Sequence, residues 1–496
     1  MAFSEHLVSV IQTESRYPAK EGLFRPDQAY AEYPFEEVSG EKNPVYDAVR
    51  ESFHLLGMDA EHYGTKEWNP LGEVIREGQN VLIKPNMVMD YNGKPGEGVE
   101  CLYTQPSVVA AVVDYVVIAL HGTGKIVIGD APMQECKFDK LMDESGYREM
   151  LDYYRGKGID ITIVDFRELT STVEHNMHYA TINPDAKGVV VDLGQESEFA
   201  GATEKEMQKA RITNYDPRIM PTHHNGEKNE YLISKYILDA DVIINMPKPK
   251  THRKAGVTIS LKNFVGANVR KEYLPHHTQG SIHEGGDEYE KKNAFHLLRS
   301  RLQDKKNIAE AEKRYKAASF YKWIIIGCSG YLRLTHGVKY VEGSWYGNHT
   351  ISRTISDLNK IVFYADKDGK MRPEKQRQML IVADMIISGE EEGPVCPTAK
   401  PVGIIAAGIN PVAFDETITY LMGFDPEKIP TLDSAESVHE KYRLKSAEEP
   451  TVVSNMDYYD GKKPEEIAGE HLLHYIPTDG WKGHIERNTE KAGDRV

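Results

Sequence analysis

The sequence predicts an α/β protein with Rossmann-like three-layer sheets in two α/β halves, joined by a helical and irregular insertion. Short apolar runs that are typical of buried strands alternate with longer segments of helical character. Several of these runs end in a polar residue, as strands do where they border a ligand site in an open α/β sheet. The pattern stops near residue 271 and restarts near residue 376. Four segments are therefore expected: an N-terminal extension at 1–77, an α/β domain at 78–270, an insertion at 271–375, and a second α/β segment with a C-terminal tail at 376–496.

The first α/β domain follows an extension that is expected to hold a strand at 6–11 and a helix at 45–56. Its predicted elements, in order, are a strand ending at Lys84, a helix at 104–120, a strand at 125–130, a helix at 138–154, a strand at 161–165 and a further strand at 188–193. Thr104 is expected to cap the first of these helices. The strand–helix–strand spacing predicts right-handed parallel crossovers. No GxGxxG fingerprint follows a strand, so no dinucleotide site is inferred.

Composition excludes several classes of protein. The net charge of −16 argues against general nucleic-acid binding, which needs a basic surface. The four cysteines are far apart and form no CxxC pair, so no iron–sulfur cluster is expected, and isolated cysteines suit a reducing cytoplasm. The N-terminus lacks the features of a signal peptide, and no apolar run reaches the roughly 18 residues of a membrane span. A cytoplasmic location is expected.

The stretch from Lys248 to Lys271 is the most informative part of the chain. It carries seven cations and no acid, although the whole chain has 60 basic and 76 acidic residues. A cluster of one sign among glycines and apolar residues indicates a pocket for an anion. A helix expected to begin near 255–258 would add backbone N–H donors. The alternatives are a solvent-exposed stripe, or cations that pair with acids from elsewhere in the chain.

Two parts of the insertion leave alternatives open. The segment 272–287 is dense in histidines and acids, so it is either a metal site or a polar lid over the pocket. Adjacent histidines in an extended segment point in opposite directions, so at most one of His276 and His277 is expected to face any one ion. Further on, the apolar segment 317–332 is too short to cross a bilayer. It is a buried helix, a contact in a homodimer, or an interfacial anchor for peripheral membrane contact.

The final third repeats the α/β pattern, with strands at 378–387 and 402–406. Asp384 stands near the end of the first strand, and 388–394 is expected to be a tight acidic turn. One interpretation is that Asp384 and Glu392 face the basic cleft, where they pair with Lys250 or Lys262 or ligate a divalent cation together with the substrate. The other is that the turn is exposed and its charges are screened by water and salt.

These motifs resemble the DUF362 family, a domain of unknown function, over roughly residues 78–425. The residues that carry the resemblance are Ile83 to Asn86, Gly129-Asp130, Asn245 to His252, Ala255 to Thr258, Leu261 to Asn263, Gly266, Asp384 and Glu392 to Pro394. Some members carry a ferredoxin-like module, which this sequence lacks. The long form, with an insertion at 272–365, resembles members associated with gene sets for bacterial surface polysaccharides.

A fainter resemblance is to lactate racemase-type proteins. It rests on His252, the Ala255-Gly256 pair and Lys262. The lysine that holds the nickel cofactor in that family has no assigned counterpart here.

Two functions remain open from the sequence. The first is an enzyme acting on an anionic small molecule, such as a phosphorylated or carboxylated sugar, by histidine and lysine acid–base chemistry such as epimerisation. The second is a non-catalytic anion- or glycan-binding or scaffold protein. The predicted catalytic residues are His252, Lys262, Asp130 and Asp384. The predicted substrate-binding residues are Lys84, Asn86, Lys248, Lys250, Arg253, Asn263 and Lys271, and Asp130, Asp384 and Glu392 are candidate ligands for a divalent metal ion.

Overall fold

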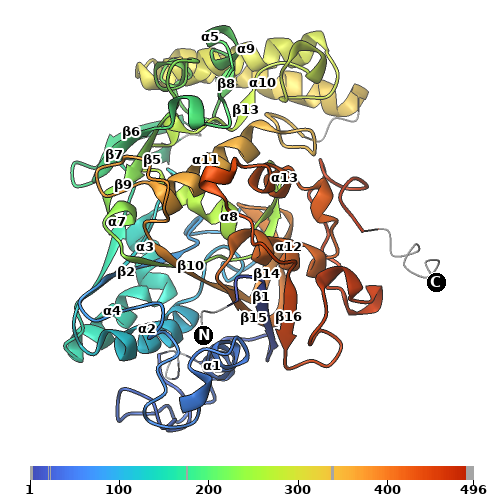
Figure 1. Cartoon of the computed structure of the whole chain (residues 1–496). Coiled ribbons are helices and arrows are strands. Elements are labelled where there is room, and N and C mark those ends of the chain that lie inside the picture. Colours follow the sequence, from blue (N-terminus) through green and yellow to red (C-terminus); the bar gives the residue numbers. More distant parts are fainter. Residues whose placement is uncertain (1–3, 20–21, 23, 175–176, 337–339, 488–496) are drawn as a thin grey trace.

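The computed structural model describes residues 4–487 except 20–21, 23, 175–176 and 337–339. A ten-stranded sheet runs through the molecule (Figure 1). Its main path, in order, is β16 (Thr451–Ser454), β1 (Leu7–Gln12), β15 (Cys396–Gly408), β14 (Gln378–Glu392), β10 (Val242–Met246), β2 (Asn80–Pro85), β3 (Lys125–Asp130) and β4 (Ile161–Asp165). The strands from β14 to β4 are parallel, whereas β15 is antiparallel to both β14 and β1.

Helices cover both faces of the sheet. One face carries α1 (Pro44–Leu55), α2 (Pro106–Leu120), α3 (Phe138–Ser145) and α4 (Tyr147–Gly156). The other carries α11 (Thr350–Tyr364), α12 (Pro411–Leu421) and α13 (Pro430–Glu436). Because successive residues of a strand point to opposite faces, Val242 and Ile244 join the first core and Ile243 joins the second. The α/β class with a three-layer arrangement is confirmed.

The two predicted α/β segments share this one sheet. β14, from the second segment, pairs with β10 from the first, and β1, from the N-terminal extension, lies between β15 and β16. The predicted helix at 138–154 is divided at Gly146, which has a φ of 92°. Thr104 does not cap α2, because its hydroxyl donates to the carbonyl of Met246 instead.

Smaller elements surround the sheet. Three two-stranded sheets pair β5 (Leu169–Glu174) with β6 (Met177–Ile182), β7 (Gly188–Asp192) with β9 (Glu230–Ser234), and β8 (Ala210–Arg211) with β13 (His277–Thr278). A short hairpin joins β11 (Lys250–His252) to β12 (Gly256–Thr258). The short helices are α5 (Glu204–Met207), α6 (Met220–His223), α7 (Lys235–Leu238) and α8 (Ser260–Asn263).

The insertion contributes three long helices with different environments. α11 lies in the core, whereas α9 (Ala294–Ala311) and α10 (Tyr315–His336) pack against each other at one end of the molecule (Figure 1). Over the described ranges, no helix combines the length and the apolar character that crossing a membrane requires.

Candidate functional site

Three neighbouring strands bring polar side chains to one edge of the sheet. β10, β2 and β3 are adjacent and parallel, and Asn245, Lys84 and Asp130 lie at or next to their carboxyl ends. Lys84 Nζ donates to Asp130 Oδ1 at 2.7 Å, and Asn263 Nδ2 donates to Asn245 Oδ1 at 2.7 Å. The prediction that these strand ends lie side by side is confirmed.

Asp130 is held tightly by protein groups. Besides Lys84, it accepts hydrogen bonds from the backbone N–H groups of Met87 at 2.7 Å and Ala131 at 2.8 Å. A Cβ atom on Gly266 would lie only 1.8 Å from Asp130 Oδ1, so the backbone of residue 266 can approach this closely only as glycine. The carboxylate thus fixes the loops that follow β2 and β3.

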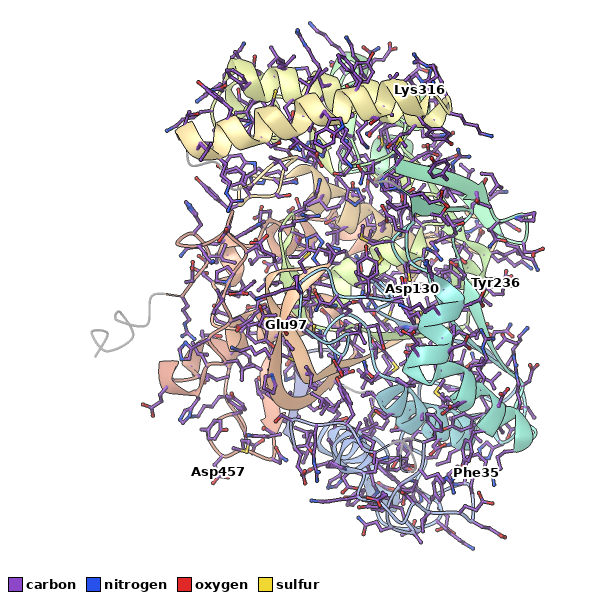
Figure 2. The ribbon with its side chains drawn as sticks, turned by 180° about the vertical axis from the view of Figure 1, so that it is seen from behind. Phe35, Glu97, Asp130, Tyr236, Lys316 and Asp457 are labelled. Atoms are coloured by element: carbon purple, nitrogen blue, oxygen red, sulfur yellow. The ribbon has the colours of Figure 1, made fainter. Side chains whose placement is uncertain are left out.

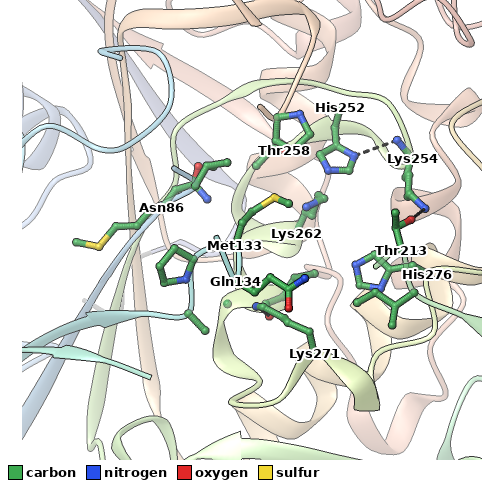
Figure 3. A pocket seen from close by; sticks show the side chains of 18 of the residues that line it. Asn86, Met133, Gln134, Thr213, His252, Lys254, Thr258, Lys262, Lys271 and His276 are labelled. Carbon is green, nitrogen blue, oxygen red and sulfur yellow. Dashed lines mark hydrogen bonds between the residues drawn. The ribbon is translucent and has the colours of Figure 1, made fainter. Parts of the chain in front are cut away.

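A cavity of about 200 Å³ lies beside this edge (Figure 3). Its basic and histidine side chains are His252, Arg253, Lys254, Lys262, Lys271 and His276. Two acids also border it: Asp130, which is paired with Lys84, and Glu135, whose Oε1 lies 3.3 Å from His178 Nδ1. The cations that border the cavity thus outnumber the acids, and one of the two acids, Asp130, is already paired with Lys84.

The His252 ring has a defined tautomer when neutral. Its Nδ1 accepts hydrogen bonds from the backbone N–H groups of Lys254 (Figure 3) and Ala255, both at 3.1 Å. The proton of the neutral ring is therefore on Nε2. Burial, reinforced by the nearby charge of Lys262, holds the pKa of His252 well below its usual value. Neutral His252 is consequently a hydrogen-bond donor through Nε2.

His276 has the opposite tautomer. Its Nδ1 lies 2.8 Å from the carbonyl oxygen of Leu274, and a carbonyl only accepts, so Nδ1 carries the proton. Burial, followed by the charge of Lys254, holds the pKa of His276 well below its usual value. The neutral ring thus keeps a lone pair on Nε2, for which the described residues supply no hydrogen-bond donor. In their neutral forms, the His276 ring can therefore accept a hydrogen bond at Nε2 and the His252 ring can donate one from Nε2.

Two lysines at the cavity have lowered pKa values. Burial lowers the pKa of Lys262 to about 8 and that of Lys271 to about 7. Lys271 Nζ donates to the carbonyl of Val265 at 3.0 Å, whereas Lys262 Nζ has no hydrogen-bond partner in the described part of the chain. Both amines can therefore exchange a proton near neutral pH, and an anion bound beside them would favour their charged forms.

Three predicted anion ligands lie behind the cavity wall. Lys84, Lys248 and Lys250 are fully buried and bonded to protein groups: Lys84 to Asp130, Lys248 to Asp384 at 2.9 Å, and Lys250 to Asn86 Oδ1 at 2.6 Å. None of the three borders the cavity, contrary to the expectation that Lys84 and Lys248 border one cleft with Asp130. The other predicted substrate-binding residues do border it: Asn86, Arg253, Asn263 and Lys271.

The helix expected at 255–258 is absent. Residues Gly256–Thr258 form β12, and only the single-turn α8 follows. The first N–H groups of that turn, from Ser260 and Leu261, are bound by Asp415 at 2.8 and 3.0 Å. The backbone donors predicted for an anion are thus used within the protein.

The predicted acidic turn is also different. β14 continues through Glu392, and the chain reverses only after it. Glu390 pairs with Lys400 at 2.9 Å, Glu391 pairs with Lys94 at 2.7 Å, and Glu392 accepts from the backbone N–H of Asp479 at 2.8 Å. The paired strands spread the glutamates over separate partners, so neither predicted pairing, with Lys250 or with Lys262, is formed.

The three candidate metal ligands are not brought together. Asp130 pairs with Lys84, Asp384 with Lys248, and Glu392 with a backbone N–H group. Across the ranges that the structure describes, no group of three or more His, Cys, Asp or Glu residues is arranged to hold a metal ion. Asp384 is fully buried in its ion pair and does not border the cavity.

Lys254, His276, Gln134 and Thr213 are among the cavity residues that were not predicted from the sequence. Lys254 belongs to the basic stretch 248–271, and His276 belongs to the segment 272–287. His276 borders the cavity, whereas its neighbour His277 does not. Gln134 and Thr213 had no distinguishing pattern in the sequence. Lys254 Nζ donates to Thr213 Oγ1 at 3.1 Å and to the carbonyl of Glu342 at 2.6 Å. These hydrogen bonds hold in place the part of the cavity wall that Lys254 and Thr213 form.

The chain is similar to a known protein family and to a named cyanobacterial protein. A family model described as a domain of unknown function (DUF362) matches residues 81–190 and 185–420. A protein of Synechocystis sp. named as thylakoid-associated is 28% identical over 196 residues, which make up 40% of this chain and 41% of that protein. The match thus spans less than half of that relative. No solved structure matches the chain.

Proposed function

The chain belongs to the DUF362 family, and from its cavity we propose that it is an enzyme that transfers protons on a small anionic molecule. The substrate class is a carboxylated or phosphorylated sugar, and the reaction is one such as epimerisation. The cavity, at about 200 Å³, is smaller than the roughly 300–1,000 Å³ typical of drug-sized ligands, so it suits a small metabolite better than a polymer.

One observation carries the proposal: two histidines at one cavity have opposite tautomers fixed by the backbone. A lone pair on His276 Nε2 and an N–H on His252 Nε2 are the two groups that abstraction of a proton next to a carboxylate requires. A solvent-exposed surface patch would not need either tautomer to be fixed.

The chemistry follows from these roles. Lys262 and Lys271, in their charged forms, hold the carboxylate or phosphate. His276 takes the proton from the carbon next to the carboxylate, and the electron pair of the broken C–H bond moves into the carboxylate. His252 donates a hydrogen bond to the oxygen on which negative charge grows. A proton returned to the opposite face by the Lys262 ammonium then inverts the carbon centre.

The proposal keeps the predicted cytoplasmic location. It also keeps surface-polysaccharide metabolism as the setting, which rests on the resemblance of the long form to members with that association.

Hydrogen exchange tests the proposal. The protein is incubated with a panel of uronic acids and sugar phosphates in deuterated water, and NMR follows deuterium entering at the carbon next to a carboxylate or a carbonyl group. His276→Gln is expected to slow exchange by about 10²–10⁴-fold, the usual contribution of a general base. His283→Gln, which alters an exposed histidine of the same segment, should leave the rate unchanged.

The non-catalytic alternative has a distinct outcome. An anion-binding protein would show heat of binding for some panel members and no exchange with any of them. Exchange that survives His276→Gln at the wild-type rate would contradict the assignment of the base.

A further inference from the structure

Helix α10 has two opposite apolar faces, and only one of them is covered. Ala318, Ile325, Cys328 and Leu332 are buried on the side toward the protein. On the other side Phe320 is 63% exposed, Trp323 71% and Leu334 88%. Because Phe320 and Leu334 are four turns apart, the exposed apolar stripe is about 21 Å long.

The charge of α10 is as unusual as its exposure. The helix contains three cations, Lys316, Lys322 and Arg333, and no acidic residue, in a chain whose net charge is −16. Lys316 and Arg333 have no acidic partner among the residues that the structure describes, and they stand near the two ends of the stripe. Figure 2 shows Lys316 at the end of the molecule, remote from Asp130.

We propose that this outer face of α10 docks the protein on the surface of an anionic lipid bilayer. An interfacial helix combines exposed aromatic and aliphatic side chains with cations that meet lipid phosphates, and α10 has both. Tryptophan is favoured at the boundary between headgroups and acyl chains. The net negative charge of the rest of the chain repels such a surface, so the protein approaches it with the end that carries α10.

A second copy of the chain fits the same face less well. With the exposed Gly327 and Gly330 between them, Phe320, Trp323 and Leu334 follow a spacing of three and four positions, which two helices could interlock. In a symmetric parallel pair Lys316 would face its own copy, and in an antiparallel pair it would approach Arg333 of the other chain. Either arrangement brings like charges together, and α10 has no acid to offset them.

Tryptophan fluorescence tests the proposal directly. The chain has four tryptophans; Trp68, Trp345 and Trp481 are at most 1% exposed, so Trp323 alone reports on the outside. Vesicles of phosphatidylcholine mixed with phosphatidylglycerol should shift its emission to the blue and sediment with the protein. Vesicles of phosphatidylcholine alone should bind at least fivefold less, and added salt should weaken binding.

Matched variants decide the outcome. Phe320→Ser with Trp323→Ser should reduce sedimentation with anionic vesicles at least tenfold, whereas Tyr91→Ser with Val190→Ser, two residues exposed elsewhere, should not. The proposal is overturned if wild-type protein fails to bind, or if both double variants lose binding equally. A dimer that the α10 variant disrupts, without vesicle binding, would assign the face to a second copy.

Discussion

The buried ion pair between Lys248 and Asp384 allows a sharp test of the fold. Both side chains are 0% exposed, and the carboxylate also accepts from the Tyr17 hydroxyl at 2.8 Å and the Gln105 N–H at 2.9 Å. Asp384→Asn leaves the Lys248 ammonium buried without a counter-charge. Removing one partner of such a pair costs about 3–5 kcal/mol. Asp384→Asn is therefore expected to lower the free energy of unfolding, because Asp384 is paired inside the protein and does not border the cavity.

Glu391→Gln is the matched control. Its pair with Lys94 is about one-third exposed on both sides, at 34% and 38%, and exposed pairs contribute about 0–1 kcal/mol. Urea unfolding followed by circular dichroism compares the free energies of unfolding. Adding Lys248→Met to Asp384→Asn removes the stranded cation and should recover part of the loss. Equal unfolding midpoints for Asp384→Asn and Glu391→Gln would refute the account of this pair.

Two further predictions follow from the cavity. Affinity for sulfate, whose charge is constant near neutral pH, should fall between about pH 6 and about pH 9. The lowered pKa values of Lys271, about 7, and Lys262, about 8, make these amines neutral over that range, whereas a bound anion requires them charged. Calorimetry in matched buffers measures the affinity, and an affinity that rises with pH would contradict the prediction. Gly266→Ala should destabilise the fold by about 1–3 kcal/mol, because its Cβ would lie 1.8 Å from Asp130 Oδ1. In the same unfolding assay Gly40→Ala, with no atom within 4 Å of the added Cβ, should change stability by less than about 0.5 kcal/mol.

The sequence predicted the parallel strands β2, β3, β4 and β10 well because their apolar runs are short and end abruptly, whereas β11, β12 and β16 were not predicted. The strand at 125–130 and the strand at 161–165 have the expected bounds, and the polar residues at the ends of β2 and β3 are neighbours. Their parallel order follows from crossover geometry. Such apolar runs involve only neighbouring residues, so they can be identified without knowing which distant segments are in contact.

The site was harder to predict because partners remote in the sequence decide which lysines are free. Lys248 and Lys262 look alike in the basic stretch of the sequence. In the structure Lys248 forms an ion pair with Asp384, whereas Lys262 Nζ has no hydrogen-bond partner among the described residues. The roles of His252 and His276 depend on single backbone contacts that no spacing rule reveals. The sequence predicts a tight turn at 388–394, but the pairing of β14 with β15 continues to Glu392 and Cys396.

The central claim is that the cavity binds an anion through Lys262 and Lys271, and isothermal titration calorimetry with a uronic acid tests it most directly. Lys262→Met and Lys271→Met should each weaken binding by about 1.5–3 kcal/mol, the usual contribution of a hydrogen bond to a charged group. Lys235→Met, which removes an exposed lysine paired with Asp239, should bind as the wild type does. Unchanged affinity in both cavity variants, or an equal loss in Lys235→Met, would contradict the claim.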